Sequence, residues 1–315
     1  MGTTSPLASI VILYYKRREI IEKTLRAALA QEYEHREIIV VDNHSEDDIG
    51  DLVRALDPRI RLLDLPANLG ACCGRNAGIR AALGDVIVVI DDDVCFASPR
   101  ELGNIVREFA QRPAYHVLAL QVCDPQTGEV RVREWCHTRP FEDYVDREFE
   151  TNWFGEGASA FRREVFDRCG LYYEPLFYGA EGHDMVLRIL DQGFRILHTP
   201  WVRVNHWASQ QGRTTGRQYY YFTRNFIWTA YKDYRFWAGL CFVVPKLAMM
   251  AYFAYRSSSY RPVLSGIRDG LRGLRMVRAE RAPVSNITLR YMAEQEKWRP
   301  SIIARLRRHR VEPQI

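Results

Sequence analysis

The sequence lacks the features that would mark a secreted, repeat or nucleic-acid-binding protein. Its 7 cysteines are an odd number with no regular spacing and no C-x-x-C motif. This pattern excludes a regular disulfide framework and favours free thiols in a reducing compartment. The formal net charge is only +5, which by itself is too weak to indicate nucleic-acid binding. No internal repeat and no low-complexity segment is present, so we expect an ordinary globular chain without a nucleic-acid partner.

Targeting segments are also scarce. The first seven residues have neither a basic stretch nor an apolar core, so we expect no signal peptide. Pro6 stands where a myristoylation signal needs Ser or Thr. One apolar stretch, Phe236 to Tyr255, approaches the length of a membrane span, but Pro245 and Lys246 fall in its middle. Because a central lysine costs about 3 kcal/mol on insertion scales, we do not expect a clean transmembrane helix.

Short β-branched runs alternate with amphipathic stretches over the first 98 residues. They predict strands at 9–14, 37–41, 60–63 and 86–90, and helices at 19–31, 49–56 and 71–83. Such alternation with short connections predicts a parallel sheet covered by helices. Later segments predict helices at 99–112, 163–169 and 185–192, and strands at 117–123, 157–161, 194–197 and 202–206. Residues 131–155 have no clear pattern.

The most informative stretch is 86–96, where five β-branched apolar residues run into Asp91, Asp92 and Asp93. The run is typical of a strand buried on both faces, and its carboxyl end is where open α/β sheets bind ligands. Three adjacent carboxylates repel one another unless a cation offsets their charge. Mg²⁺ or Mn²⁺ suits such oxygen ligands and would in turn hold a diphosphate. In an extended chain Asp91 and Asp93 share one face. A solvated acidic turn is the alternative.

Two clusters with nucleotide-binding chemistry come earlier in the chain. Asp42 follows the second predicted strand, where a carboxylate can accept hydrogen bonds from a ribose or a base, although it suits an Asx turn equally well. Asn68-x-Gly70 and Arg75-Asn76-x-Gly78 combine glycines, which let the backbone approach a ligand, with an arginine that can meet phosphate. Ordinary helix packing is the alternative for this cluster.

Two further candidates come later in the chain. Glu181 and Asp184 precede a predicted helix, where a carboxylate beside a metal-bound diphosphate would deprotonate a hydroxyl. A helix N-cap is the alternative for Asp184. His206 ends a predicted strand, and it becomes a candidate metal ligand only if the fold brings it near Asp93.

In this order, these residues resemble the large family of inverting glycosyltransferases called family 2, which has the GT-A fold. The resemblance covers about residues 7–235. The matching segments are Ser9–Leu13, Ile39–Ser45, Asn68–Gly70, Gly74–Gly78, Asp91–Asp93, Gly157–Arg163, Glu181–Arg188, Val204–His206 and Tyr219–Asn225. The resemblance implies an α/β fold with a mostly parallel sheet flanked by helices. We expect a catalytic domain over 1–235, with a nucleotide-sugar half at 1–98 and an acceptor half at 99–235. A basic helical extension would then cover 236–315.

The resemblance also implies roles for individual residues. The donor nucleotide-sugar would contact Asp42, Asn43, Asn68, Gly70, Arg75, Asn76, Asp91 and Asp92. The metal, Mg²⁺ or Mn²⁺, would be held by Asp91, Asp93 and His206. Trp153 and Phe154 would wall the acceptor site. The catalytic base would be Glu181 or, as second choice, Asp184, because Gly182 replaces the second member of the family's usual Glu-Asp pair.

The resemblance implies a metal-dependent transfer of a sugar from a nucleotide-diphosphate donor, with UDP or dTDP favoured. A carboxylate takes the proton of the acceptor hydroxyl as it attacks the anomeric carbon, and the metal stabilises the departing diphosphate. One direct displacement inverts the anomeric configuration.

The C-terminal third is rich in arginine and aromatic residues. The segments 267–277 and 302–310 alternate apolar side chains with arginines, a pattern that suits an anionic membrane surface. Packing on the core or on a second subunit, as in a homodimer, is the alternative. Membrane contact would favour a lipid-linked acceptor and a location at the inner face of the cell membrane. Otherwise we expect a cytoplasmic protein with a glycan or small-molecule acceptor.

Three other functions share parts of this pattern. A nucleotidyltransferase that forms sugar nucleotides should have a glycine-rich loop after the first strand, but Tyr14–Arg18 contains no glycine. A haloacid-dehalogenase-like phosphatase needs Thr or Val where Cys95 stands. A non-catalytic nucleotide-sugar-binding protein stays open because of Gly182.

Overall fold

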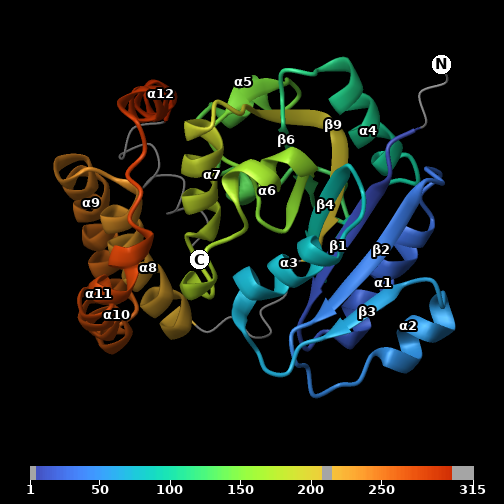
Figure 1. Cartoon of the computed structure of the whole chain (residues 1–315), viewed down its shortest axis with the longest axis horizontal. Coiled ribbons are helices and arrows are strands. Elements are labelled where there is room, and N and C mark those ends of the chain that lie inside the picture. The colour runs from blue at the N-terminus through green and yellow to red at the C-terminus, as the bar shows by residue number, and fades with distance from the viewer. Residues whose placement is uncertain (1–4, 208–214, 300–315) are drawn as a thin grey trace.

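The computed structural model describes residues 5–207 and 215–299. The strands are β1 Ala8–Tyr14, β2 Arg36–Asp42, β3 Arg61–Asp64, β4 Val86–Asp91, β5 Val94–Phe96, β6 Val117–Cys123, β7 Phe149–Thr151, β8 Ala158–Arg162 and β9 Ile196–His206. The helices around them are α1 Arg18–Leu29, α2 Gly50–Leu56, α3 Gly70–Ala81, α4 Glu101–Gln111, α5 Phe141–Tyr144, α6 Arg163–Cys169 and α7 Glu181–Asp191. The strands form one sheet in the order β3-β2-β1-β4-β8-β6-β9-β5, with β7 paired to β9 (Figure 1).

The first half of the sheet is parallel, as its sequence pattern predicts. β1 pairs in parallel with both β2 and β4, and β2 pairs in parallel with β3. All seven residues of β1 are buried, because helices cover both faces of the sheet. The register sets Tyr14 opposite Asp42 and Leu13 opposite Asp91. The carboxyl ends of β2 and β4 therefore meet at one edge of the sheet.

The second half of the sheet is mixed. β8 runs antiparallel to β4 and β6, whereas β6 and β9 are parallel. The two strands expected at 194–197 and 202–206 are in fact one strand, β9, which stays paired with β6 across an irregularity at Leu120–Gln121. The short strand β5 pairs with the end of β9 and sets Val94 opposite His206. This pairing brings His206 close to the acidic triplet.

The core has one layer on each face of the sheet. On one face, Ile21 and Leu25 of α1 pack together with Leu102 and Ile105 of α4 against the strands. On the other face, the packing side chains come from α3, α6 and α7 and continue into the C-terminal helices. The structure thus has the three-layer helix–sheet–helix arrangement predicted from the sequence.

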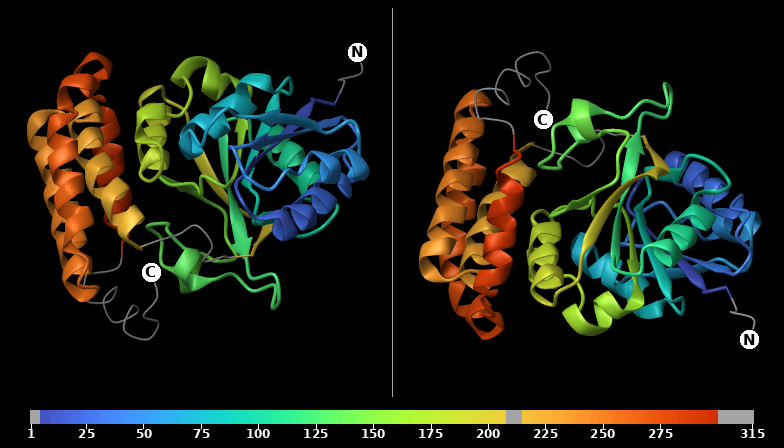
Figure 2. Two further views of the ribbon diagram at one scale, coloured as in Figure 1. Left: turned by 90° about the horizontal axis from the view of Figure 1, so that it is seen from below. Right: turned by 90° about the horizontal axis from the view of Figure 1, so that it is seen from above.

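The C-terminal helices form a bundle beside α7, on the side away from the sheet (Figure 2). They are α8 Thr215–Asp233, α9 Phe236–Arg256, α10 Tyr260–Arg272, α11 Leu274–Val277 and α12 Asn286–Glu296. α8 packs against both α9 and α10. Close approach depends on glycine, because a Cβ at Gly266 would lie 2.7 Å from the Tyr220 carbonyl oxygen on α8. The basic segment expected at 302–310 lies outside the described residues.

Candidate functional site

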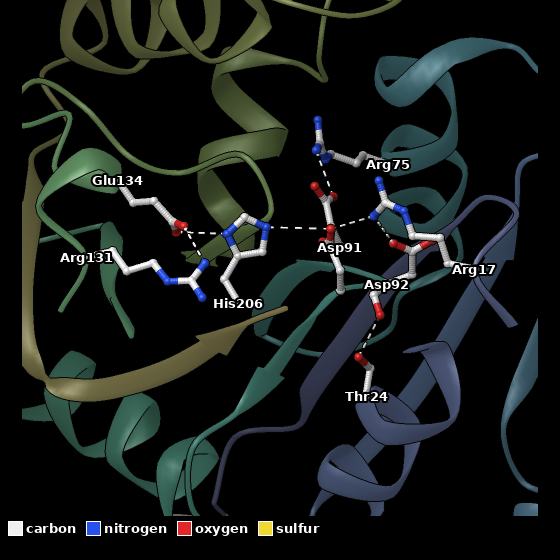
Figure 3. A network of polar contacts seen from close by, with 9 residues as sticks. Arg17, Thr24, Arg75, Asp91, Asp92, Arg131, Glu134 and His206 are labelled. Atoms are coloured by element: carbon white, nitrogen blue, oxygen red, sulfur yellow. Dashed lines mark hydrogen bonds and ion pairs between the residues drawn. The ribbon is translucent and has the colours of Figure 1, made fainter. Parts of the chain in front are cut away.

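The three aspartates lie where β4 ends and the chain turns into β5. Arg17, at the beginning of α1, places its Nη1 atom 2.7 Å from Asp92 Oδ1 and 2.6 Å from Asp93 Oδ2. Asp91 instead accepts from Arg75 Nη2 at 2.8 Å (Figure 3). The expectation that Asp91 and Asp93 share a face is wrong, because the chain turns at Asp92–Asp93 and the alternation of an extended strand ends there.

Asp92 anchors this turn inside the fold. Its Oδ2 accepts a hydrogen bond from the backbone N–H of Tyr15 at 2.9 Å, and its carbonyl oxygen accepts one from the Thr24 hydroxyl at 2.7 Å. Only 3% of Asp92 is exposed. Burial raises the pKa of Asp92 to about 7, against the opposing charge of Arg17. Asp92 therefore positions its two neighbours rather than facing solvent.

His206 lies beside Asp93, as the sequence argument required. Its Nε2 is 3.6 Å from Asp93 Oδ2. Its Nδ1 is 2.8 Å from Glu134 Oε2 (Figure 3). Arg131 pairs with Glu134 at 3.3 Å. Burial disfavours the charged ring, but Asp93 and Glu134 outweigh it and raise the pKa of His206 to about 9. Glu134 was missed by sequence reasoning because it lies in the unpatterned segment 131–155.

The side chains of this cluster have the chemistry of a divalent-cation site, and Arg17 and Arg75 lie against its carboxylates. Carboxylate oxygens with one imidazole nitrogen suit Mn²⁺ or Mg²⁺. Glu134 would orient the ring through its other nitrogen, as carboxylates behind metal-bound histidines do. Within residues 5–207 and 215–299, no three acidic, histidine or cysteine side chains are arranged to hold a metal. Asp91, Asp93 and His206 are the groups that would hold it.

Arg75 connects the acidic turn to α7. Besides Asp91, its guanidinium contacts Glu181 Oε1 at 3.1 Å. The side chains of Arg75 and Glu181 are only 5% and 4% exposed. Glu181 is therefore a buried carboxylate with a fixed cationic partner.

α7 begins earlier than the sequence pattern indicates. Its first residue is Glu181 rather than Met185, so Asp184 lies within the first turn and is not the N-cap, which is Ala180. Asp184 is fully buried and pairs with Arg188 and Lys232, each at 2.6 Å. Although burial opposes ionisation, these two cations lower the pKa of Asp184 to about 2. This carboxylate is held ionised as a structural partner.

Glu156 contributes a further carboxylate near α7. It lies between Gly155 and Gly157 in the turn before β8, and its Oε1 accepts a hydrogen bond from the backbone N–H of Gly182 at 3.1 Å. Burial and the charge of Glu181 raise the pKa of Glu156 to about 7. Sequence reasoning missed Glu156, since a single glutamate in a turn has no spacing signal.

The candidate nucleoside contacts gather at the ends of β2 and β3. Asp42 is buried and accepts a hydrogen bond from the backbone N–H of Ser45 at 2.8 Å, which is the Asx turn given above as the alternative. Asn43 donates to Asn68 Oδ1 at 3.1 Å and accepts from Leu69 N at 2.9 Å. Gly70 has φ +86°, and a Cβ there would collide with Phe177. The two loops are thus tied together at the edge that carries Asp91.

Three other predicted residues lie in different surroundings. Asn76 is buried and joins α3 to the segment 172–174, donating to the Tyr172 carbonyl at 2.8 Å and accepting from its N–H at 3.0 Å. Phe154 is fully buried against Phe161, so its ring is part of the core. Trp153 is partly exposed and packs edge-on against His137, which leaves it available to line an acceptor site.

Comparison with known proteins agrees with this architecture. The family model described as "Glycosyl transferase family 2" matches residues 9–170. The succinoglycan biosynthesis protein ExoO of Rhizobium meliloti is 43% identical over 89 residues, which are 28% of this chain and 26% of that protein. The glucosyl-dolichyl phosphate glucuronosyltransferase of Haloferax volcanii is 28% identical over 255 residues, covering 73% of this chain and 74% of that protein.

A solved structure shows the same fold. The structure of GalNAc-T7 with UDP, GalNAc and Mn²⁺ superposes with a TM-score of 0.60 at 16% identity, over 74% of this chain and 49% of that one. At this identity the match concerns the fold alone, and it confirms the GT-A arrangement predicted from the sequence. Because the family model spans more than half of the 315 residues and includes the acidic turn and Arg75, the chain belongs to glycosyl transferase family 2.

Proposed function

We propose that this protein is a metal-dependent inverting glycosyltransferase that moves a sugar from a nucleotide-diphosphate donor to a hydroxyl group. The observation that carries the proposal is the convergence of Asp42, Asp91, Asp93 and His206 at one edge of a family 2 fold. Open α/β sheets bind their ligands at this edge. The Mn²⁺ and UDP in the GalNAc-T7 structure support a divalent metal and a uridine donor, with dTDP as the other favoured nucleotide.

The residues at this edge would bind different parts of the donor, depending on where they lie. Asp42 and the loop around Asn43, Asn68 and Gly70 would receive the nucleoside, because they lie next to the acidic turn and hold their backbones close together. Asp91, Asp93 and His206 would hold the metal, which when bound offsets the charge of the leaving diphosphate. Arg17 and Arg75 already lie on these carboxylates and would be drawn to phosphate oxygens.

The competing functions have less support. The segment between β1 and α1 is short and contains no glycine, unlike the phosphate loop of a nucleotidyltransferase. Cys95 is buried within β5, so it leaves no hydroxyl for phosphatase chemistry at that position. A non-catalytic binding protein would bind the nucleotide-sugar donor without turning it over, so a turnover assay distinguishes it from an enzyme.

We also propose that the protein contacts a membrane and that its acceptor is linked to a lipid. Within the described residues, one helix, α9, is long and apolar enough to span a bilayer, and little of its apolar stretch is buried in the fold. Lys246 in its middle faces the Phe226 ring of α8 at 5.4 Å. The Haloferax relative's name contains a dolichyl phosphate, which supports a lipid-linked acceptor.

The decisive test is calorimetric titration with UDP, dTDP, GDP and CDP, each with and without Mn²⁺. One nucleotide should bind, and Mn²⁺ should tighten its Kd by about tenfold or more, which is typical of coupling between two bound ligands. Asp93→Ala should abolish the Mn²⁺ effect, while Asp167→Ala, at an exposed position on α6, should retain it. No binding of any nucleotide would overturn the proposal.

A further inference from the structure

Gly182 removes a carboxylate from the position where the family resemblance expects the second member of a Glu-Asp pair. The space beside Gly182 is nevertheless filled. A Cβ at Gly182 would lie 2.7 Å from Cδ and 2.9 Å from Cγ of Glu156, so the Glu156 side chain would have to move before any side chain could occupy position 182. The carboxyl group of Glu156 therefore stands where a side chain at position 182 would begin, and it is hydrogen-bonded to the Gly182 N–H.

The turn that carries Glu156 also lies against the acidic cluster. Asp91 N–H donates to the carbonyl oxygen of Gly157 at 3.2 Å. A Cβ at Gly157 would lie 2.9 Å from Asp91 Oδ1, so only glycine allows this close packing. Glu156 is thereby held between the carboxyl end of β4, where the donor diphosphate is proposed to bind, and the first turn of α7.

The other two carboxylates at α7 are poorly placed to accept a proton. Glu181 is 3% exposed and pairs with Arg75, and Asp184 is fully buried between Arg188 and Lys232. Glu156 is only half-buried. Burial together with the charge of Glu181 raises the pKa of Glu156 to about 7, in the range that suits a general base near neutral pH.

The geometry points to Glu156 as the catalytic base, a carboxylate supplied by the β7–β8 turn in place of the one missing at Gly182. This inference rests on the proposed glycosyltransferase function. As the acceptor oxygen forms its bond to the anomeric carbon, its proton passes to the Glu156 carboxylate. The bond between that carbon and the phosphate oxygen breaks, and its electron pair leaves with the nucleoside diphosphate. Glu181, held by Arg75, is then a positioning residue.

The first test compares Glu156→Gln with the wild-type protein. The readout is release of UDP from UDP-glucose, UDP-galactose and UDP-GlcNAc in the presence of Mn²⁺, with water as the nucleophile. Loss of a general base should lower kcat by about 10²–10⁴-fold. UDP affinity by calorimetry should stay within threefold, since Gln keeps the shape and the acceptor oxygen for Gly182 N–H. The matched control is Glu164→Gln, an exposed glutamate on α6, which should match the wild type.

The second test moves the carboxylate back to α7. Gly182→Asp alone should be crowded by Glu156 and lose activity. Glu156→Ala should also be inactive, but the combined variant Glu156→Ala/Gly182→Asp has room for the new side chain. It should regain at least tenfold in kcat over Glu156→Ala, which a merely structural role for Glu156 would not produce.

The outcomes separate this inference from the function on which it rests. A Glu156→Gln variant that turns over donor within threefold of the wild type would overturn the role of Glu156 and leave the glycosyltransferase proposal standing. Wild-type protein that binds none of the four nucleotides, or that binds UDP and releases none from any of the three donors, would overturn both.

Discussion

At the scale of single residues, Arg75 is the side chain on which the site depends most. It is almost fully buried and contacts a carboxylate on each side, Asp91 on β4 and Glu181 on α7. Desolvating the charges of Arg75 and Glu181 is costly, and their mutual attraction and that of Asp91 offset the cost. Removing the arginine would leave Glu181 as an isolated buried charge.

We expect Arg75→Met to lower the free energy of unfolding by about 3–5 kcal/mol, the usual effect of breaking a buried ion pair from one side. Arg80→Met is the matched control, because Arg80 lies on the same helix and pairs with Glu174 at 2.8 Å but is 58% exposed. Its loss should cost about 1 kcal/mol or less. Urea unfolding of the purified proteins measures both, and equal losses would contradict the role given to Arg75.

At the scale of elements, the turn that leads into α7 is held by α8. Phe177 and Ala180 have φ values of 64° and 67°, and such left-handed backbone is unfavourable for residues other than glycine. Asn225, fully buried on α8, donates to the carbonyl oxygens of Leu176, Tyr178 and Gly179 at 2.9, 2.9 and 2.6 Å. The segment Tyr219–Asn225, one of those that match the family pattern, thus fixes the start of α7 rather than contacting the candidate nucleoside-binding residues.

Asn225→Ala should therefore destabilise the turn that leads into α7 more than it weakens donor binding. Leaving buried carbonyl groups unsatisfied costs about 1–3 kcal/mol, so the melting temperature should fall by several degrees. The kcat for donor turnover should also fall, because Glu181 and Gly182 lose their fixed positions, while UDP affinity should stay near that of the wild type. The control is Gln218→Ala, which removes a 3.5 Å contact to Tyr178 from the same helix. A large loss of UDP affinity in Asn225→Ala would show a direct nucleotide contact instead.

At the scale of the whole molecule, the helical bundle presents an apolar stripe to solvent. The exposed side chains on α9 recur at helical spacing and comprise Phe236, Trp237, Leu240, Val244, Tyr252 and Tyr255. Lys246 lies on the opposite side of the helix, toward α8. A stripe of this length with large aromatic residues is typical of a helix that lies in a membrane interface.

We expect the full chain to co-float with vesicles that contain anionic phosphatidylglycerol. The double variant Trp237→Ser/Val244→Ser should bind them about a hundredfold or more weakly, given about 1.5–3 kcal/mol for each large apolar side chain buried. Trp201→Ser, at a 55% exposed tryptophan on β9, is the control and should bind like the wild type. Equal binding by all three proteins would remove α9 as the membrane contact.

The local pattern of apolar residues was sufficient to predict most of the fold. The strands β1, β2, β4 and β6 lie within about one residue of their predicted ranges, because continuous β-branched runs have few alternatives to a buried strand. The division of residues 194–206 into two strands was wrong, since Pro200 interrupts the pattern while β9 continues through it. The beginning of α7 was also misplaced, because Glu181 and Gly182 have no helical signature apart from the packing that holds them.

The sequence by itself determined that the carboxyl ends of the strands, with the acids that follow them, lie at one edge of the sheet. Alternation of strands and helices with right-handed connections brings those ends together. Only the tertiary structure decided which charges meet. Arg75 and Glu181 are 106 positions apart, Glu134 and His206 are 72 apart, and Gly182 and Glu156 are 26 apart. No local spacing encodes such pairs. They arise when packed strands and helices bring distant side chains into the same dehydrated space, where each charge must find a partner.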